Sequence, residues 1–159
     1  MIELENLNDY AKDLTSGDGT NGILLEIFKR LEITNGTCVE FGAADGVWNS
    51  NTLPLWRDRD WSALLLEPDT DQYYKLMDNL TKFSEKQQLK VIACNVGVSP
   101  HPKSRGYDTF SDNGYAFLDD IIDGFNSTDN PVQMSNIKND FDLLSIDVDG
   151  NDYYIWQNF

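Results

Sequence analysis

The chain has 159 residues, one histidine, two cysteines and a formal net charge of −15 at pH 7. This length suits a single domain, which can bury roughly two thirds of its unfolded surface without a metal ion or disulfides. The acidic charge argues against direct binding to nucleic acid or to an anionic membrane surface, because both would repel the chain.

Residues 1–21 are expected to form an N-terminal arm or lid on a domain that spans residues 22–159. They contain the turn-rich stretch SGDGTN, whose Gly and Asn interrupt helical periodicity. The first ten residues lack the apolar core of a signal peptide, and no apolar run approaches the roughly 18 residues of a membrane span. We therefore expect a cytoplasmic protein, in which Cys38 and Cys94 are reduced and buried.

Helix and strand patterns then alternate along the chain. From Gly22, apolar residues recur at helical spacing at Leu24, Ile27, Phe28 and Leu31, and Asn35-Gly36 ends the segment. Short apolar runs predict strands at 37–41, 61–66, 90–98 and 141–146. Between and after them, helices are expected from about residue 51 with Pro54 in the first turn, and around 73–80, 118–125 and 152–159.

This alternation predicts an α/β fold, a series of βαβ units with a parallel sheet and right-handed crossovers. In such sheets ligands bind at the carboxyl ends of the strands. The residues that follow the four predicted strands are small or polar: 40–46, 67–69, 95–97 and 147–152.

The first of these turns, Gly42 to Gly46, and the acidic Glu67 about 20 residues later together favour a nucleoside-containing cofactor. Small residues let a ligand approach the backbone, and a carboxylate at the end of the second strand can accept hydrogen bonds from ribose hydroxyls. The turn also fits a tight corner of any α/β protein. Ala44 stands where a dinucleotide site needs glycine, and the nearby carboxylates Glu40 and Asp45 favour S-adenosylmethionine, which carries a sulfonium and an ammonium group.

Four segments resemble, in order and spacing, the motifs of the FkbM-type branch of Rossmann-like S-adenosylmethionine-dependent methyltransferases: VEFGAADGVWNSNTLPLW, WSALLLEPD, NVGVSP and FDLLSIDVDGNDYYIW. The resemblance covers about residues 20–156. It implies a Rossmann-like three-layer α/β/α fold with a mainly parallel sheet of order 3-2-1-4. It implies O-methylation of a hydroxyl on a sugar or small metabolite. It also implies cofactor contacts by Glu40, Gly42, Ala43, Gly46, Glu67, Asn95, Val96 and Asp147, with Asp147 beside the transferring methyl group.

Methyl transfer to a hydroxyl needs positioning and a group that accepts one proton. Asp147, Asp149 or His101 could do so, although a loop histidine is more often simply solvated. Asp147 and Asp149 also offer hard oxygen ligands for a Mg²⁺ ion that orients the acceptor. Alternatively, Asp149 and Asp152 cap the helix that begins there.

Of the tryptophans, Trp56, Trp61 and Trp156 are expected to pack in the core or against helices, and Trp48, two residues past the Gly turn, is the candidate for contact with a ligand.

The resemblance further implies that the fold is cut off after its fourth strand, because the family's last three strands have no counterpart. Strand 141–146 would then be a sheet edge, and we expect a second copy, another protein, the N-terminal arm or further residues to cover it. Two other functions remain open: a non-catalytic cofactor-binding remnant or interaction module, and a nucleotide-sugar or dinucleotide enzyme.

Overall fold

The computed structural model describes residues 6–98, 115–116, 121 and 140–157. In chain order its elements are the 3-10 helix η1 (Leu7–Tyr10), α1 (Thr20–Arg30), β1 (Thr37–Phe41), α2 (Leu53–Asp58), β2 (Ser62–Leu66), α3 (Thr70–Leu80), α4 (Glu85–Gln88), β3 (Val91–Cys94), β4 (Gly97–Val98), β5 (Tyr115–Ala116), β6 (Leu143–Ile146) and α6 (Asp152–Trp156). His101 and most of the helix expected at 118–125 lie outside the described residues.

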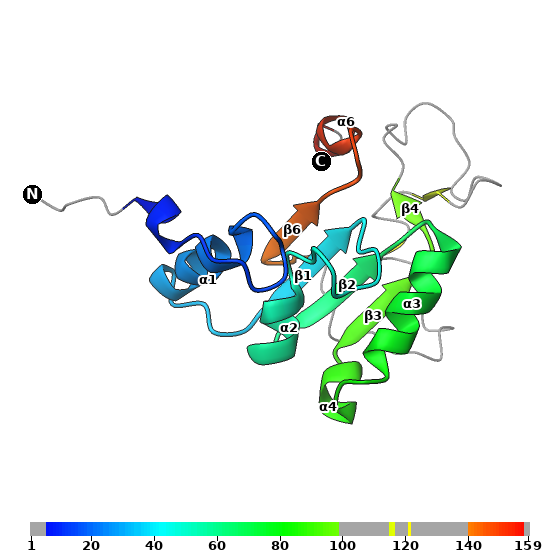
Figure 1. The fold of residues 1–159 in the computed structure, drawn as a ribbon, viewed down its shortest axis with the longest axis horizontal. Helices are drawn as coiled ribbons and strands as arrows, with labels where there is room; N and C mark the ends of the chain where they lie inside the picture. The colour runs from blue at the N-terminus through cyan, green and yellow to red at the C-terminus, as the bar shows by residue number, and fades with distance from the viewer. Residues whose placement is uncertain (1–5, 99–114, 117–120, 122–139, 158–159) are drawn as a thin grey trace, which may run out of the picture.

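The main sheet has four parallel strands in the order β3-β2-β1-β6 (Figure 1). These strands correspond to the four expected from the sequence, in the expected spatial order. The prediction of an α/β fold built around a parallel sheet is therefore confirmed. In the register, Phe41 pairs with Leu66 on one side and with Ile146 on the other, so these strands end at one edge of the sheet.

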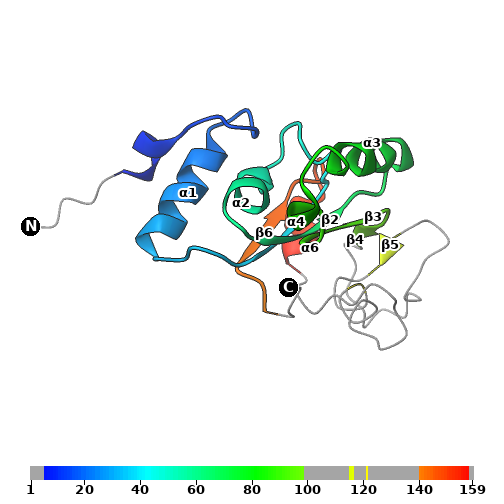
Figure 2. The same ribbon diagram turned by 90° about the horizontal axis from the view of Figure 1, so that it is seen from below.

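The two central strands are buried on both faces, which explains their nearly continuous apolar sequences. All five residues of β1 are buried, and so are the last four of β2. On one face, α1, α2 and α3 pack against alternate strand residues (Figure 2). That core cluster includes Phe28, Trp56, Trp61, Leu65 and Leu76. Because these helices shield this face of the sheet from water, its strand residues can be apolar.

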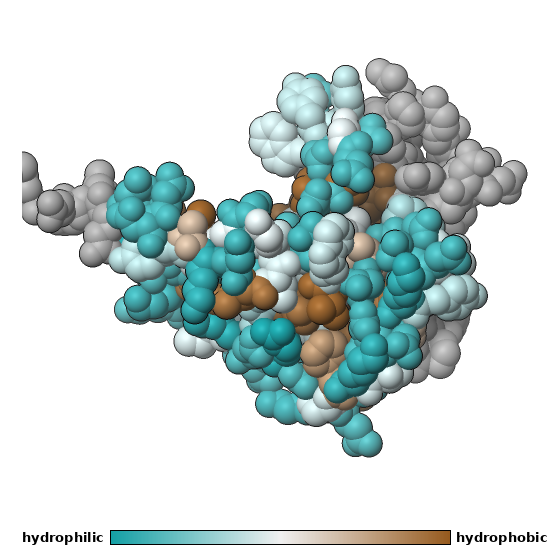
Figure 3. Space-filling view, viewed as in Figure 1, coloured by the Kyte–Doolittle hydropathy of each residue, from teal (hydrophilic) through white to brown (hydrophobic). Residues whose placement is uncertain are grey.

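The opposite face carries a second apolar cluster. It contains Phe41 and Leu66 from the central strands, together with Ile121 and with Ile155 of α6. Figure 3 shows a largely hydrophilic surface over the described helices, with hydrophobic residues visible mainly between them.

The prediction of one strand over 90–98 is wrong, because the chain leaves the main sheet at Asn95. β3 ends at Cys94, and β4 pairs in parallel with β5 in a separate two-stranded sheet. The Asn95 side chain donates to the backbone carbonyls of Glu67 and Pro68, at 2.9 and 3.1 Å. The pattern of apolar residues over 90–98 cannot reveal this break, because the groups that bind the Asn95 amide follow β2, almost 30 positions earlier in the chain.

Trp56 and Trp61 are buried as expected, but the expectation for Trp156 is wrong: its side chain is 65% exposed. Helix α6 buries Ile155 and leaves Tyr153 and Trp156 on its outer side, with their rings 6.4 Å apart. A five-residue helix has only one face toward the sheet, and the aliphatic residue occupies it.

Within the described ranges, β6 pairs only with β1, so the cover expected over its other edge stays a prediction. None of the helices in the described part of the chain is long and apolar enough to cross a membrane.

Gly42 joins the ends of β1 and β6. Its φ is +72°, and a Cβ placed there would collide with the backbone carbonyl oxygen of Asp147. The Gly42 and Ala43 N–H groups both donate to the Leu66 carbonyl, at 3.0 and 3.1 Å. Glycine at this position therefore allows the three strand ends to converge.

We expect Gly42→Ala to lower the free energy of unfolding by about 2–4 kcal/mol, through the strained φ and the backbone collision. Gly150→Ala is the matched control, because Gly150 also has positive φ (+95°) but nothing lies within 4 Å of its added Cβ. The control should lose only about 1–2 kcal/mol. Urea unfolding of both variants checks this, and equal losses would contradict the proposed collision.

Candidate functional site

The candidate site lies at the carboxyl edge of the main sheet, where the sequence predicted it. Glu67 follows β2 directly, and its Oε2 accepts the backbone N–H of Ala44 at 2.7 Å. Its Oε1 accepts the N–H of Asp69 at 2.8 Å. One carboxylate thus connects the turn after β1 to the turn after β2, and it is only 6% exposed. Each of its oxygens retains a second lone pair for another donor.

The Gly42–Gly46 turn is compact and held by its own backbone. The Gly46 N–H donates to the Ala43 carbonyl at 2.7 Å, and Ala44 has a φ of +46°. Asp45 accepts the N–H groups of Val47 and Trp48, at 2.9 and 2.7 Å. The Asp45 carboxylate therefore stabilises the end of this turn and the two residues that follow it.

Asn95 and Val96, the predicted adenine contacts, lie after β3 and have different environments. The Asn95 amide oxygen accepts the Thr70 hydroxyl at 3.0 Å, and its amide nitrogen is bonded to the Glu67 turn. The Val96 side chain is buried in the apolar cluster of the sheet face opposite α1–α3. Asn95 thus orders the site's border, while Val96 contributes mainly to the core.

Glu40, predicted to touch the cofactor, is instead buried at 2% exposure and bonded within the chain. It accepts the Ser50 and Thr52 hydroxyls, at 2.9 and 2.6 Å, and the Asn51 N–H at 2.7 Å. None of the ion pairs found among the described residues involves it. Burial raises the pKa of Glu40, although the three hydrogen bonds act in the opposite direction.

Sequence reasoning missed Asn21, which attaches the N-terminal arm to the loop at residues 50–52 that Glu40 binds. Its side chain is 1% exposed. The amide oxygen accepts the N–H groups of Thr15 and Ser16, both at 2.7 Å. The amide nitrogen donates to the carbonyls of Ser50 and Asn51, at 3.2 and 3.0 Å. An asparagine after a Gly-rich stretch reads as a turn residue, and nothing local reveals partners 30 positions away.

The loop at residues 50–52 also contacts β6, the strand that precedes Asp147. The Asn51 amide donates to the Ser145 hydroxyl of β6 at 3.1 Å. Because Glu40, Asn21 and Ser145 all hold residues 50–51, the arm, β1 and β6 are fixed relative to one another at the carboxyl edge.

Asp147 lies in a concentration of negative charge at the end of β6. Its side chain is exposed, and its N–H donates to the Phe41 carbonyl at 3.2 Å. Partial desolvation raises the pKa of Asp147, and so do the carboxylates of Asp152, Asp149 and Asp18. Asp18 belongs to the N-terminal arm, so the arm contributes charge to the site.

Asp152 stabilises the turn before α6 rather than capping the helix. Its carboxylate accepts the N–H groups of Val148 and Gly150, at 2.9 and 3.1 Å, and these bonds lower its pKa. Asn151 occupies the N-cap position of α6, but its side chain makes no capping hydrogen bond. Asp149 is exposed, with a φ of +52°.

Within the described residues, no three His, Cys, Asp or Glu side chains are placed to hold a metal ion together. The Mg²⁺ site at Asp147 and Asp149 therefore stays a prediction. The second proposed proton acceptor, His101, lies outside the described residues. Trp48 is 71% exposed beside the turn after β1, where a ligand could reach it.

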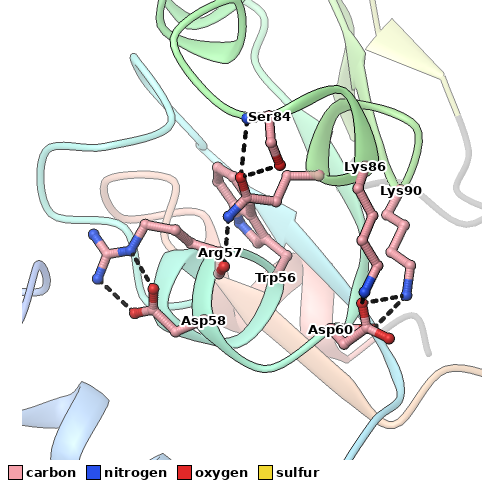
Figure 4. Close-up of a pocket in the computed structure, with 8 residues that line it drawn as sticks. Trp56, Arg57, Asp58, Asp60, Ser84, Lys86 and Lys90 are labelled. Atoms are coloured by element: carbon pink, nitrogen blue, oxygen red, sulfur yellow. Dashed lines mark hydrogen bonds and ion pairs between the residues drawn. The ribbon is translucent and has the colours of Figure 1, made fainter.

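Taken together, the carboxyl edge offers exposed carboxylates, the buried carboxylate of Glu67 with lone pairs for further donors, and a tight small-residue turn. This combination attracts cations and suits a ligand that carries both hydroxyl donors and positive charge. A separate pocket of about 300 Å³ lies at the other edge of the sheet, beside the residues that precede β2 and β3 (Figure 4). It shares no lining residue with the candidate site.

Comparison of the chain with protein-family models, curated proteins and solved structures found no match.

The raised pKa of Glu40 predicts a pH-dependent stability. Because folding favours its protonated form, this contribution is fully present below the ordinary value of 4.5 and is lost as pH rises through the higher folded pKa. Glu40→Gln should remove it, since an amide can donate to the Ser50 and Thr52 hydroxyl oxygens. The variant should therefore gain stability relative to the wild type as pH rises above 4.5, measured by urea unfolding. A pH-independent difference would show that Glu40 is ionised in both states.

Proposed function

We propose that the chain is an S-adenosylmethionine-dependent O-methyltransferase of the FkbM type, with a Rossmann-like cofactor domain and an acceptor hydroxyl on a sugar or small metabolite. The observation that carries this proposal is the convergence of the Gly42–Gly46 turn, Glu67 and Asp147 at one sheet edge. The order β3-β2-β1-β6 supports it, because in a parallel sheet of this kind the ligand-binding crevice lies at the carboxyl ends of the strands.

The described residues fit the proposed cofactor through charge and hydrogen bonding. Asp18, Asp147 and Asp149 supply negative potential for a sulfonium and an ammonium group, as the raised pKa of Asp147 indicates. The remaining lone pairs of Glu67 would accept the ribose hydroxyls. Glu40 would act indirectly, by holding residues 50–52 beside the site.

The bound cofactor supplies an activated methyl group, and the protein must position the acceptor and remove its proton. Asp147 is the proposed proton acceptor, because it is exposed and lies at the end of β6, at the same edge of the sheet as Glu67. Its raised pKa makes it a better base than an ordinary aspartate. The proposed roles of His101 as an alternative base, and of a Mg²⁺ ion at Asp147 and Asp149, need separate tests.

Calorimetry with S-adenosylmethionine, S-adenosylhomocysteine and NAD tests the cofactor. The first two should bind and NAD should not. Glu67→Gln should weaken binding of S-adenosylmethionine by about 1–3 kcal/mol, or roughly 5- to 150-fold, because a ribose hydroxyl loses its charged acceptor.

Glu32→Gln is the control, because Glu32 is exposed at the end of α1, before β1. It should leave the affinity unchanged. The proposal fails if neither adenosyl compound binds, and the role of Glu67 fails if its substitution has no effect in a folded variant.

Methyl transfer to a panel of glycans and small hydroxylated metabolites tests the reaction. Asp147→Asn should lower the rate with the best acceptor by about 10²- to 10⁴-fold, the range for loss of a general base, with a smaller change in cofactor affinity. Asp149→Asn tests whether Asp149 is the base instead of Asp147. Binding of S-adenosylmethionine without transfer to any acceptor would favour the non-catalytic cofactor-binding module.

A further inference from the structure

The N-terminal arm forms a closed loop before α1. The Lys12 N–H donates to the Gly19 carbonyl, and the Gly22 N–H donates to the Lys12 carbonyl, both at 3.1 Å. The Asp13 carboxylate accepts the Gly19 N–H. These bonds attach the arm to the first turn of α1, so residues 12–22 form one structural unit.

One side of this unit lies against the connection between β1 and α2 (Figure 1, Figure 2). The Asn21 amide donates to the carbonyls of Ser50 and Asn51, at 3.2 and 3.0 Å. The Thr15 hydroxyl also donates to the Ser50 carbonyl, at 2.8 Å. Because the Asn21 side chain is 1% exposed, water cannot replace its bonds unless the contact opens.

Asn51 joins the arm to two strands of the sheet. Its carbonyl accepts the Asn21 amide, and its N–H donates to Glu40 of β1 at 2.7 Å. Its side-chain amide donates to the Ser145 hydroxyl of β6 at 3.1 Å. Glu40 and Ser145 are partners in the β1–β6 register, so this single residue spans the two neighbouring strands.

The contact matters most for β6, the outer strand of the described sheet. Within the described ranges β6 pairs only with β1, so one row of backbone hydrogen bonds holds it. Ser145 lies two residues before Asp147, the proposed proton acceptor. The bond from Asn51 to Ser145 therefore adds a second constraint on the position of Asp147.

The Glu67 side of the site has a separate support. Glu67 accepts the N–H groups of Ala44 and Asp69, at 2.7 and 2.8 Å. The Asn95 amide holds the same turn through the carbonyls of Glu67 and Pro68. Among the hydrogen bonds of the described residues, none joins these four residues to residues 12–22.

We propose that the N-terminal arm is a strap that holds the Asp147 side of the site in place, with Asn21, Asn51 and Ser145 as positioning residues. This inference rests on the proposed methyl transfer, in which Asp147 must meet the acceptor hydroxyl. A misplacement of about 1 Å can lower a rate by about 10²-fold. Loss of the strap should therefore slow the reaction while the cofactor still binds.

Two single variants cut the link between the loop and β6. Asn51→Ala and Ser145→Ala each remove the bond between these two side chains and leave the backbone bonds of residue 51 in place. Each should lower kcat with the best acceptor by about 10-fold or more, whereas the Kd for S-adenosylmethionine should change by less than about twofold. Because both remove the same bond, the double variant should be no slower than the slower single variant.

Ser145→Thr keeps a hydroxyl acceptor, so it should recover most of the rate that Ser145→Ala loses. Asn21→Ala detaches the arm and should also lower kcat more than it changes the Kd. Asn6→Ala is the matched control, because Asn6 is exposed in the same arm and its side chain accepts only the Asn8 N–H there, at 3.0 Å. It should leave both kcat and Kd unchanged.

Backbone amide NMR of the ligand-free variants tests the strap without the reaction. In Asn21→Ala the shift changes should extend beyond residues 12–22 and 50–52 to residues 145–147. Changes that stop at the loop would overturn the strap, and so would an unchanged kcat in the Asn51 and Ser145 variants. Equal losses of kcat and cofactor affinity would overturn it as well, since they indicate general damage to the fold. If the wild type binds no S-adenosylmethionine, the proposed function fails, and the amide shifts alone decide whether the strap exists.

Discussion

A buried carboxylate that has no cationic partner in the described structure organises the carboxyl edge of this protein. Glu40 lies in the central strand β1 and accepts three hydrogen bonds from residues 50–52. The backbone carbonyls of the same loop accept the Asn21 amide, which attaches the N-terminal arm. A fully satisfied polar group of this kind fixes one arrangement, because any other arrangement leaves a buried acceptor or donor unpaired. The exposed groups of the candidate site depend on this arrangement for their positions.

The carboxylates of this edge therefore fall into two groups, one that stabilises the backbone and one that stays exposed to solvent. Glu40, Glu67 and Asp152 accept backbone or hydroxyl donors and hold turns together. Asp147 and Asp149 remain exposed and give the edge its negative potential. A protein can place repelling carboxylates at a binding edge when other carboxylates stabilise the backbone beneath them. Substitutions of Glu40 and Asp152 should act through the fold, and those of Asp147 and Asp149 through ligand and chemistry. Glu67 belongs to both groups, because it holds two turns and is also proposed to bind the ligand.

The two edges of the sheet also differ in charge. Asp18, Asp147 and Asp149 gather near the carboxyl ends of the strands, whereas Arg57, Lys86 and Lys90 lie near the amino ends. The first edge is locally negative, whereas at the second edge the cations are paired with Asp58 and Asp60. The overall charge of −15 conceals this separation, since composition records how many charges there are and not where they lie.

The sequence by itself determined the parallel α/β sheet and the edge where the candidate site lies, whereas the strand order was expected from the family resemblance. The sheet and this edge follow from local periodicity and from the geometry of βα connections, which act over short stretches of chain. It could not show that Glu40 is buried, that Asn21 anchors the arm, that Asn95 ends β3 or that Trp156 faces solvent. Only the tertiary structure decided these points, because each depends on a partner, or the lack of one, far away in the sequence. Hydrogen-bond satisfaction and burial are properties of the packed chain.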